Sequence, residues 1–333
     1  MGWLIAGLII VGVIFYLFWL RPIPTESLVS KPAPVSGYAE ALQRIQALHQ
    51  AEMATGPCHD VCLSKLYTHG HPTPHVLVFM HGYTTCPEQF AQLAEQFFEA
   101  GYNVFIPKMP YHGYANRLTN DQQYLTAEDL TVYGDQAVDI ARGLGQQVSV
   151  LGISGGGTVA AWLAQNRADV DYAIPLSALI GVGLVPTALA APFINLLRLL
   201  PSLFVWWDPR TKDKNPYSIY YAYPRYSLRS LGQLLQLGLA VRRQARQNEP
   251  AGRQILMLTN AYDVSVNRSQ LYALRDMWAS HPAVNVRWYE FEKEMKMLHD
   301  IITPGTPNIP TDEVYARLVN QVLALHQEIT EQP

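Results

Sequence analysis

The sequence predicts an α/β domain built on a mostly parallel sheet flanked by helices, because short β-rich runs alternate with longer amphipathic stretches from residue 75 onward. Strands separated by helices of this length form parallel sheets covered on both faces, and functional residues gather beyond the carboxyl ends of the strands. The expected strands cover residues 75–83, 103–110, 148–154, 172–181, 254–263 and 284–291. The expected helices cover residues 38–53, 88–99, 127–144, 158–166 and 312–329.

Length and composition agree with one large domain. The chain has 333 residues, of which 49% are hydrophobic and 15% are charged. Without its N-terminal segment about 300 residues remain, enough for an α/β domain that carries an insertion. A net charge of -3 and the lack of a basic cluster exclude nucleic acid as an expected partner.

The N-terminal segment, residues 2–20, is uncharged and long enough to cross a bilayer as a helix. Trp19 and Arg21 stand where an interfacial belt would begin, and the segment lacks the basic start and cleavage site of a signal peptide. We therefore expect a retained single-pass membrane anchor, against the alternative of a buried core helix. Arg21 and Lys31 follow the span and favour a catalytic domain on the cytoplasmic side. Residues 21–37 are rich in proline and predict an extended tether.

Residues 182–249 break the alternation of strands and helices. Their first part is strongly apolar but contains Pro186, Pro192 and Pro201, which argue against one straight helix. Arg198 and these prolines also make a second membrane span a poorer explanation than an insertion. We expect a helical lid over the active site.

The motif that predicts chemistry is GISGG, Gly152–Gly156, which follows a strand and precedes a helix. This is the G-x-S-x-G pattern in the strand–turn–helix setting that it requires. The sharp turn needs glycines two residues either side of Ser154, where side chains would collide. Ser154 would also stand at a helix N-terminus, where N–H groups and the helix dipole favour developing negative charge. Ser154 is the predicted nucleophile.

With these motifs, the chain from about residue 75 to 329 resembles the serine α/β-hydrolase superfamily, and within it the carboxylesterase and monoacylglycerol-lipase-like members that have a mid-chain lid. The segment FMHGY, Phe79–Tyr83, resembles the H-G-x element of that superfamily. The resemblance implies that the backbone N–H groups of Tyr83 and Gly155 form the oxyanion hole; the alternative is an ordinary turn at the end of a strand. PYHGY, Pro110–Tyr114, resembles a turn of these proteins and receives no catalytic role. The implied hydrolase domain covers residues 38–331.

The superfamily's chain order places the acid and then the histidine after late strands. Asp263 ends one late strand and looks like the family's acid turn, and His299 lies in the loop after the last strand. His299 would take the proton of Ser154, and Asp263 would hold the imidazole. Alternatives fit less well, because His281 precedes a strand and His326 lies on the final helix.

The three cysteines do not form a disulfide framework. Cys58 and Cys62 could pair in an oxidising compartment and leave Cys86 free, or all three could be reduced. A single free Cys86 would be a small buried side chain. The spacing matches no structural zinc site, so we expect neither a metal nor a cofactor.

The predicted function is that of a membrane-anchored serine hydrolase that cleaves carboxylic esters through an acyl-enzyme. Small-molecule or lipid esters with apolar acyl groups, such as monoacylglycerol-like lipids, are the expected substrates. Thioesters and amides need the same machinery, an acyltransferase would use it with an alcohol in place of water, and a non-catalytic lipid-binding protein would have the same fold.

Overall fold

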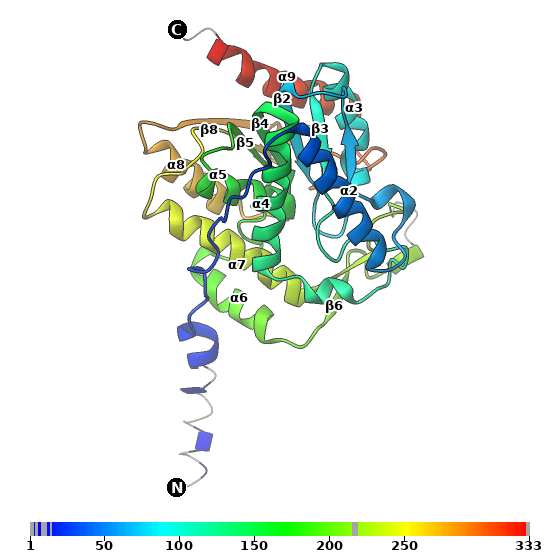
Figure 1. Cartoon of the computed structure of the whole chain (residues 1–333). Helices are drawn as coiled ribbons and strands as arrows, with labels where there is room; N and C mark the ends of the chain where they lie inside the picture. The colour runs from blue at the N-terminus through cyan, green and yellow to red at the C-terminus, as the bar shows by residue number, and fades with distance from the viewer. Residues whose placement is uncertain (1–2, 4–5, 8–11, 14, 215–218, 331–333) are drawn as a thin grey trace.

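The computed structural model describes residues 3, 6–7, 12–13, 15–214 and 219–330, and it confirms the predicted α/β class (Figure 1). These residues form a seven-stranded sheet with the order β1-β3-β2-β4-β5-β8-β9. All neighbouring pairs are parallel except β1 with β3. The strands are β1 (Lys65–Tyr67), β2 (Thr73–Met80), β3 (Asn103–Ile106), β4 (Gly145–Ile153), β5 (Tyr172–Leu176), β8 (Gln254–Asn260) and β9 (Asn285–Phe291).

Six of these strands coincide with the predicted ones. The sequence analysis missed β1, because three residues are too short to show an alternation of apolar and polar side chains. Five of the six observed strands also end earlier than predicted, and β9 ends at Phe291 as predicted. Residues 81–83, 107–110 and 177–181 are loops beyond the carboxyl ends of β2, β3 and β5, and the first and last of these loops contribute to the site described below.

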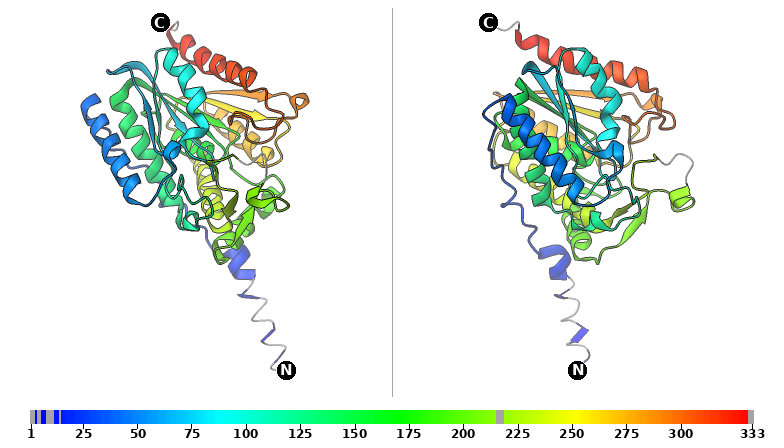
Figure 2. Two further views of the ribbon diagram at one scale, coloured as in Figure 1. Left: turned by 90° about the vertical axis from the view of Figure 1, so that its right-hand side faces the viewer. Right: turned by 45° about the vertical axis from the view of Figure 1, so that its right-hand side comes forward.

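Helices cover both faces of the sheet, as Figure 2 shows. One face carries α4, α5, α7 and α8, with α2 packed on the outside of α4, and the other carries α3 and α9. Strand side chains alternate between the two cores, so that Val78 belongs to the first and Leu77 and Phe79 belong to the second. The bounds of the helices are α2 (Tyr38–Ala54), α3 (Ala91–Glu99), α4 (Ala127–Leu144), α5 (Gly155–Asn166), α7 (Leu228–Ala245), α8 (Arg268–Ala279) and α9 (Thr311–Thr330).

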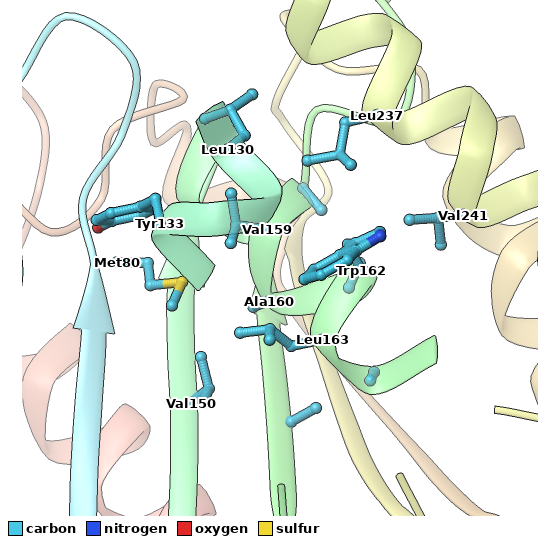
Figure 3. Close-up of a cluster of buried hydrophobic side chains, with 14 of the residues drawn as sticks. Met80, Leu130, Tyr133, Val150, Val159, Ala160, Trp162, Leu163, Leu237 and Val241 are labelled. Carbon is cyan, nitrogen blue, oxygen red and sulfur yellow. The ribbon is translucent and has the colours of Figure 1, made fainter. Parts of the chain in front are cut away.

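The helix that follows Ser154, α5, is buried from end to end. Its Trp162 is fully buried and lies beside Leu237 and Val241 of α7 (Figure 3). The ring Nε1 donates to the carbonyl of Leu28 at 2.9 Å. Val159 and Leu163 complete the packing towards the sheet and α4. Because α5 is held on all sides, the turn at its N-terminus has a fixed position.

Residues 182–249, the predicted lid, contain both an excursion and a core helix. The excursion comprises α6 (Ala190–Leu199) and a two-stranded sheet of β6 (Phe204–Trp206) and β7 (Arg225–Ser227). The remainder is α7, which packs on α4 and α5 because its Leu234, Leu237 and Val241 are buried in the first core. The segment that can cover the site therefore ends near Ser227 rather than at residue 249.

Residues 21–37 are extended, as predicted, but they are docked on the domain. Ile23 and Leu28 are buried, and Arg243 donates to the carbonyl of Ile23 at 2.9 Å. Asp135 accepts from the Ser30 hydroxyl and from the Lys31 N–H at 2.7 Å. A proline-rich composition alone does not distinguish a free linker from an extended segment that packs along helices of the domain.

The predicted membrane-spanning helix over residues 2–20 is wrong for the part of the chain that can be described. The predicted single-pass location, cytoplasmic side and membrane contact depended on this helix and are therefore not supported. Residues 2, 4–5, 8–11 and 14 lie outside the described residues. Among the described residues, every helix is too short or too polar to traverse a bilayer. The element η1 covers Tyr16–Leu20. The amide of Asn195 on α6 donates to the carbonyls of Phe18 and Arg21 at 3.3 and 2.9 Å.

Candidate active site

Ser154 occupies a strained turn between β4 and α5. Its φ of 55° and ψ of -115° lie in a region that residues with side chains rarely adopt. A Cβ on Gly152 would lie 2.2 Å from the carbonyl oxygen of Gly156, and a Cβ on Gly156 would lie 2.0 Å from that of Met80. Both positions therefore require glycine, as the motif predicted. The Ser154 N–H donates to the carbonyl of Leu176 at 3.0 Å, which fixes the turn against β5.

The structure brings His299 and Asp263 together. Nδ1 of His299 lies 2.6 Å from Oδ2 of Asp263, 36 residues earlier in the chain. The other carboxylate oxygen accepts the N–H of Ser265 at 2.8 Å. Because an ionised carboxylate can only accept, Nδ1 carries the proton, and Nε2 of the neutral ring is left as an acceptor.

Each member of this pair favours the ionised state of the other. Burial raises the pKa of the Asp263 carboxyl, but the hydrogen bond and charge of His299 and the N–H groups of Ser265 and Val266 outweigh it, so the pKa lies below its ordinary value. Burial lowers the pKa of His299, but the hydrogen bond and charge of Asp263, together with the charge of Asp300, leave it above 6.5. This imidazole is well suited to hold a proton during a reaction.

Two backbone N–H groups lie side by side next to Ser154. The N–H groups of Gly82 and Thr84 are occupied, by Gln89 Oε1 at 2.8 Å and by His112 Nε2 at 3.2 Å. The N–H of Tyr83 between them has no acceptor within the described part of the chain. The N–H of Gly155 belongs to the first turn of α5, where helical partners are missing. A Cβ on Gly155 would lie 3.3 Å from the nitrogen of Tyr83, which shows how close the two segments approach.

The loop after β2 is braced by two neutral histidines. His81 accepts the N–H of Met109 at 2.9 Å, and burial together with the charge of His112 lowers its pKa to about 3. Burial likewise lowers the pKa of His112 to about 4. His112, from the PYHGY turn that received no catalytic role, thus supports the loop that carries Tyr83. The Tyr83 hydroxyl donates to the carbonyl of Ser227 at 3.0 Å, so the loop is also joined to the start of α7.

A disulfide between Cys62 and Cys86 fixes the far end of the same loop, with Cα atoms 5.2 Å apart. Neither state left open by the sequence, a Cys58–Cys62 pair or three reduced thiols, is present, and Cys86 is not a free buried thiol. Cys58 is the free cysteine, and its Sγ lies 3.5 Å from Nζ of Lys108. The pairing depends on the fold, because the turn that contains Cys62 and the loop that contains Cys86 meet only when the sheet is assembled.

A cavity of about 710 Å³ opens above these residues. Ser154, Asp263, His299 and Tyr83 all line it. Its wall is mainly apolar and includes Leu179, Val182, Leu184, Trp207, Ile219, Tyr223, Pro224, Tyr226, Leu231, Val264 and Leu298. Trp207, Tyr223 and Tyr226 come from the excursion between β5 and α7, so part of the predicted lid segment lines this cavity.

His326, one of the alternatives to His299, lies away from the cavity. It belongs to α9, and its buried ring lies between the Tyr102 hydroxyl at 2.6 Å and the Ser149 hydroxyl at 2.9 Å. Asp300 does not pair with the imidazole; its carboxylate accepts from Gln89 and from the loop that follows it. Gln89 was missed by sequence reasoning, since glutamine in a helical stretch carries no local signal of a role.

Comparison with known proteins fits this geometry. A family described as serine aminopeptidase, S33, matches residues 71–291, two thirds of the chain. The chain belongs to this family. This serine hydrolase is also 26% identical over 167 residues to a thermostable monoacylglycerol lipase of Bacillus sp. (strain H-257). That match covers 48% of the chain and 60% of the relative's length.

Solved structures share the α/β-hydrolase fold with this serine hydrolase. A structure from work on LipS and LipT, two metagenome-derived lipolytic enzymes, aligns with a TM-score of 0.58 at 16% identity, over 80% of this chain and 99% of that one. A monoacylglycerol lipase of Paleococcus ferrophilus aligns with a TM-score of 0.58 at 15% identity, over 79% and 98%. The predicted α/β-hydrolase fold and the superfamily resemblance are thereby confirmed.

Proposed function

We propose that this serine hydrolase cleaves carboxylic esters with apolar acyl groups, with Ser154 as nucleophile, His299 as base and acid, and Asp263 as the carboxylate that orients the imidazole. One observation supports this most: the strained Ser154 and the bonded pair of His299 and Asp263 line the same apolar cavity of about 710 Å³.

In the proposed reaction, Oγ of Ser154 attacks the ester carbonyl carbon while Nε2 of His299 takes the hydroxyl proton. The carbonyl oxygen becomes an oxyanion, which accepts hydrogen bonds from the N–H groups of Tyr83 and Gly155. The C–O bond to the alcohol then breaks, and the imidazolium returns its proton to the departing oxygen. Water, deprotonated by Nε2, attacks the acyl-enzyme in the same way and releases the acid with Ser154 regenerated.

The lining of the cavity supports the choice of acyl group. An apolar acyl chain would be removed from water by contact with Leu179, Leu184, Leu231 and Trp207. Each methylene buried in this way contributes roughly 0.8 kcal/mol to the binding free energy. A monoacylglycerol-like ester combines such a chain with a small polar alcohol, and the similarity to the Bacillus monoacylglycerol lipase favours that class.

The test uses p-nitrophenyl esters of graded chain length with the wild-type protein and with Ser154→Ala. We expect kcat/KM to rise from acetate to medium or long chains, and the variant to show no turnover above background. Highest activity on acetate would contradict the apolar acyl assignment, and no hydrolysis of any ester would contradict the proposal itself. An aminoacyl p-nitroanilide included in the same series tests the peptidase activity that the family description suggests.

A further inference from the structure

Gln89 connects two loops of the site that no strand pairing joins. It lies in the short helical turn η3 (Pro87–Phe90) and is only 2% exposed. Its Oε1 accepts the N–H of Gly82 and the hydroxyl of Thr85, both at 2.8 Å. Its Nε2 donates to Oδ2 of Asp300 at 3.1 Å, across 211 residues of sequence. The orientation of the amide is dictated by its partners, because an N–H can only donate and a carboxylate can only accept.

Each end of this bridge is next to a residue of the site. Gly82 directly precedes Tyr83, whose backbone nitrogen lies close to Gly155, and Asp300 directly follows His299. The two loops leave the sheet at β2 and β9, which are separated in the strand order by β4, β5 and β8. The sheet alone therefore does not set the distance between the two loops at atomic precision. Gln89 and Asp300 also line the cavity.

The carboxylate of Asp300 has a fixed position, because three groups donate to it besides Gln89. Its Oδ1 accepts the N–H groups of Ile302 and Thr303, both at 3.1 Å, and its Oδ2 accepts the Thr303 hydroxyl at 2.6 Å. The carboxylate thus organises the backbone immediately after His299. A shift of Gln89 would therefore displace both the loop that contains Gly82 and the loop that contains Asp300.

We infer that Gln89 is a positioning residue: it fixes the loop after β2, which carries Tyr83, relative to the loop after β9, which carries His299. It does so because its amide bonds both to the N–H of Gly82 and to the carboxylate of Asp300. This inference rests on the proposed function, because it assigns Gln89 a part in the reaction of that site. A glutamine that merely satisfied buried polar groups would affect the stability of the protein and leave kcat of the folded protein unchanged. A positioning residue lowers kcat while KM and folding change little, because misplacement of reacting groups by about 1 Å can cost about 100-fold in rate.

The experiment is a cycle of Gln89→Glu, Asp300→Asn and the double variant, assayed for kcat and KM on the best p-nitrophenyl ester and for thermal unfolding. Gln89→Glu keeps an oxygen for Gly82 but places a second carboxylate against Asp300. Asp300→Asn keeps an oxygen for Ile302 but places an amide nitrogen against the Gln89 amide nitrogen. The double variant exchanges donor and acceptor and restores the bond between residues 89 and 300.

We expect each single variant to lose about 10- to 100-fold in kcat with KM within about threefold of wild type, and the double variant to recover most of that loss. Gln92→Glu is the matched control: it introduces the same charge one turn later, at an exposed position, and should leave kcat unchanged. If Gln89→Glu does not fold, Gln89→Met, which has a similar volume and no hydrogen-bonding amide, takes its place and Asp300→Asn is compared with it.

Two results would overturn the inference. Folded single variants that retain wild-type kcat would leave Gln89 a structural side chain, and a double variant less active than either single one would show that the bond between the two side chains is not what matters. In both cases an active wild-type enzyme would leave the proposed function intact. A wild-type protein without esterase activity would refute the proposed function and this inference together.

Discussion

Replacement of Asp263 by asparagine tests the role of the carboxylate that faces His299. The structure predicts which way the new amide would turn. One side-chain oxygen must remain with the N–H of Ser265, at present 2.8 Å from Oδ1, because only an oxygen can accept that hydrogen bond. The amide nitrogen would then face Nδ1 of His299, which now lies 2.6 Å from Oδ2.

A donor at that position forces the neutral imidazole into the other tautomer, with its proton on Nε2. In that state the ring cannot take the proton of Ser154. We expect kcat/KM to fall by about 1,000- to 10,000-fold, which corresponds to roughly 4–5.5 kcal/mol in the activation free energy. The change is nearly isosteric, so the folded structure should persist.

The pH dependence of the same variant gives an independent measurement. In the wild type the raised pKa of His299 keeps the ring protonated to a pH above its ordinary value of 6.5. If His299 is the base, as we propose, kcat/KM should therefore be lost as pH falls through the raised pKa. Without the carboxylate of Asp263, burial lowers the pKa of His299 against the remaining charge of Asp300 alone. The acid limb of the residual activity should therefore move to lower pH.

Asp276→Asn is the control, because that side chain is 64% exposed on α8. Its kcat/KM and pH profile should equal those of the wild type. A loss below about tenfold in Asp263→Asn, or an acid limb that stays in place, would refute the assignment of Asp263.

Two further predictions concern stability. Arg167→Met should lower the free energy of unfolding by about 3–5 kcal/mol in urea titrations, because fully buried Arg167 pairs with two buried carboxylates on α4 that would lose their counter-charge. Arg253→Met is the control: it removes an exposed ion pair and should change the free energy of unfolding by less than about 1 kcal/mol. Equal effects of the two substitutions would contradict this account. Replacing both Cys62 and Cys86 by alanine should cost about 3 kcal/mol, since the bond closes a loop of 24 residues in the unfolded chain, and an unchanged unfolding midpoint would mean that the disulfide does not form in solution.

The parts of the fold and site that the sequence predicted correctly carry local signals. Six strands are visible in the sequence as apolar runs bounded by turns. The turn at Ser154 is predicted by Gly152 and Gly156, because a side chain at either position would collide with a neighbouring carbonyl. Asp263 and His299 were located by their order after late strands, and the bond between their side chains agrees with that expectation. Their catalytic roles stay predictions until activity is measured.

Features without a local signal were missed or wrong. The bridge through Gln89 and the Cys62–Cys86 bond join segments that meet only in the assembled sheet, so neither residue spacing nor composition reveals them. The docking of residues 21–37 depends on carbonyls of the segment itself, which accept from Trp162 and Arg243 side chains. The anchor over residues 2–20 was predicted from the apolar composition of the segment and from the residues that flank it, whereas among the described residues every helix is too short or too polar to cross a membrane.

The central claim is that Ser154 reacts because His299, held by Asp263, can take its proton at the wall of one cavity. The most direct measurement is the rate and site of covalent modification by an alkyl fluorophosphonate, with peptide mapping by mass spectrometry, in the wild type and in His299→Ala. We predict stoichiometric modification of Ser154 in the wild type and a rate at least about 100-fold lower in the variant. Modification of another residue, or equal rates in the two proteins, would contradict the claim.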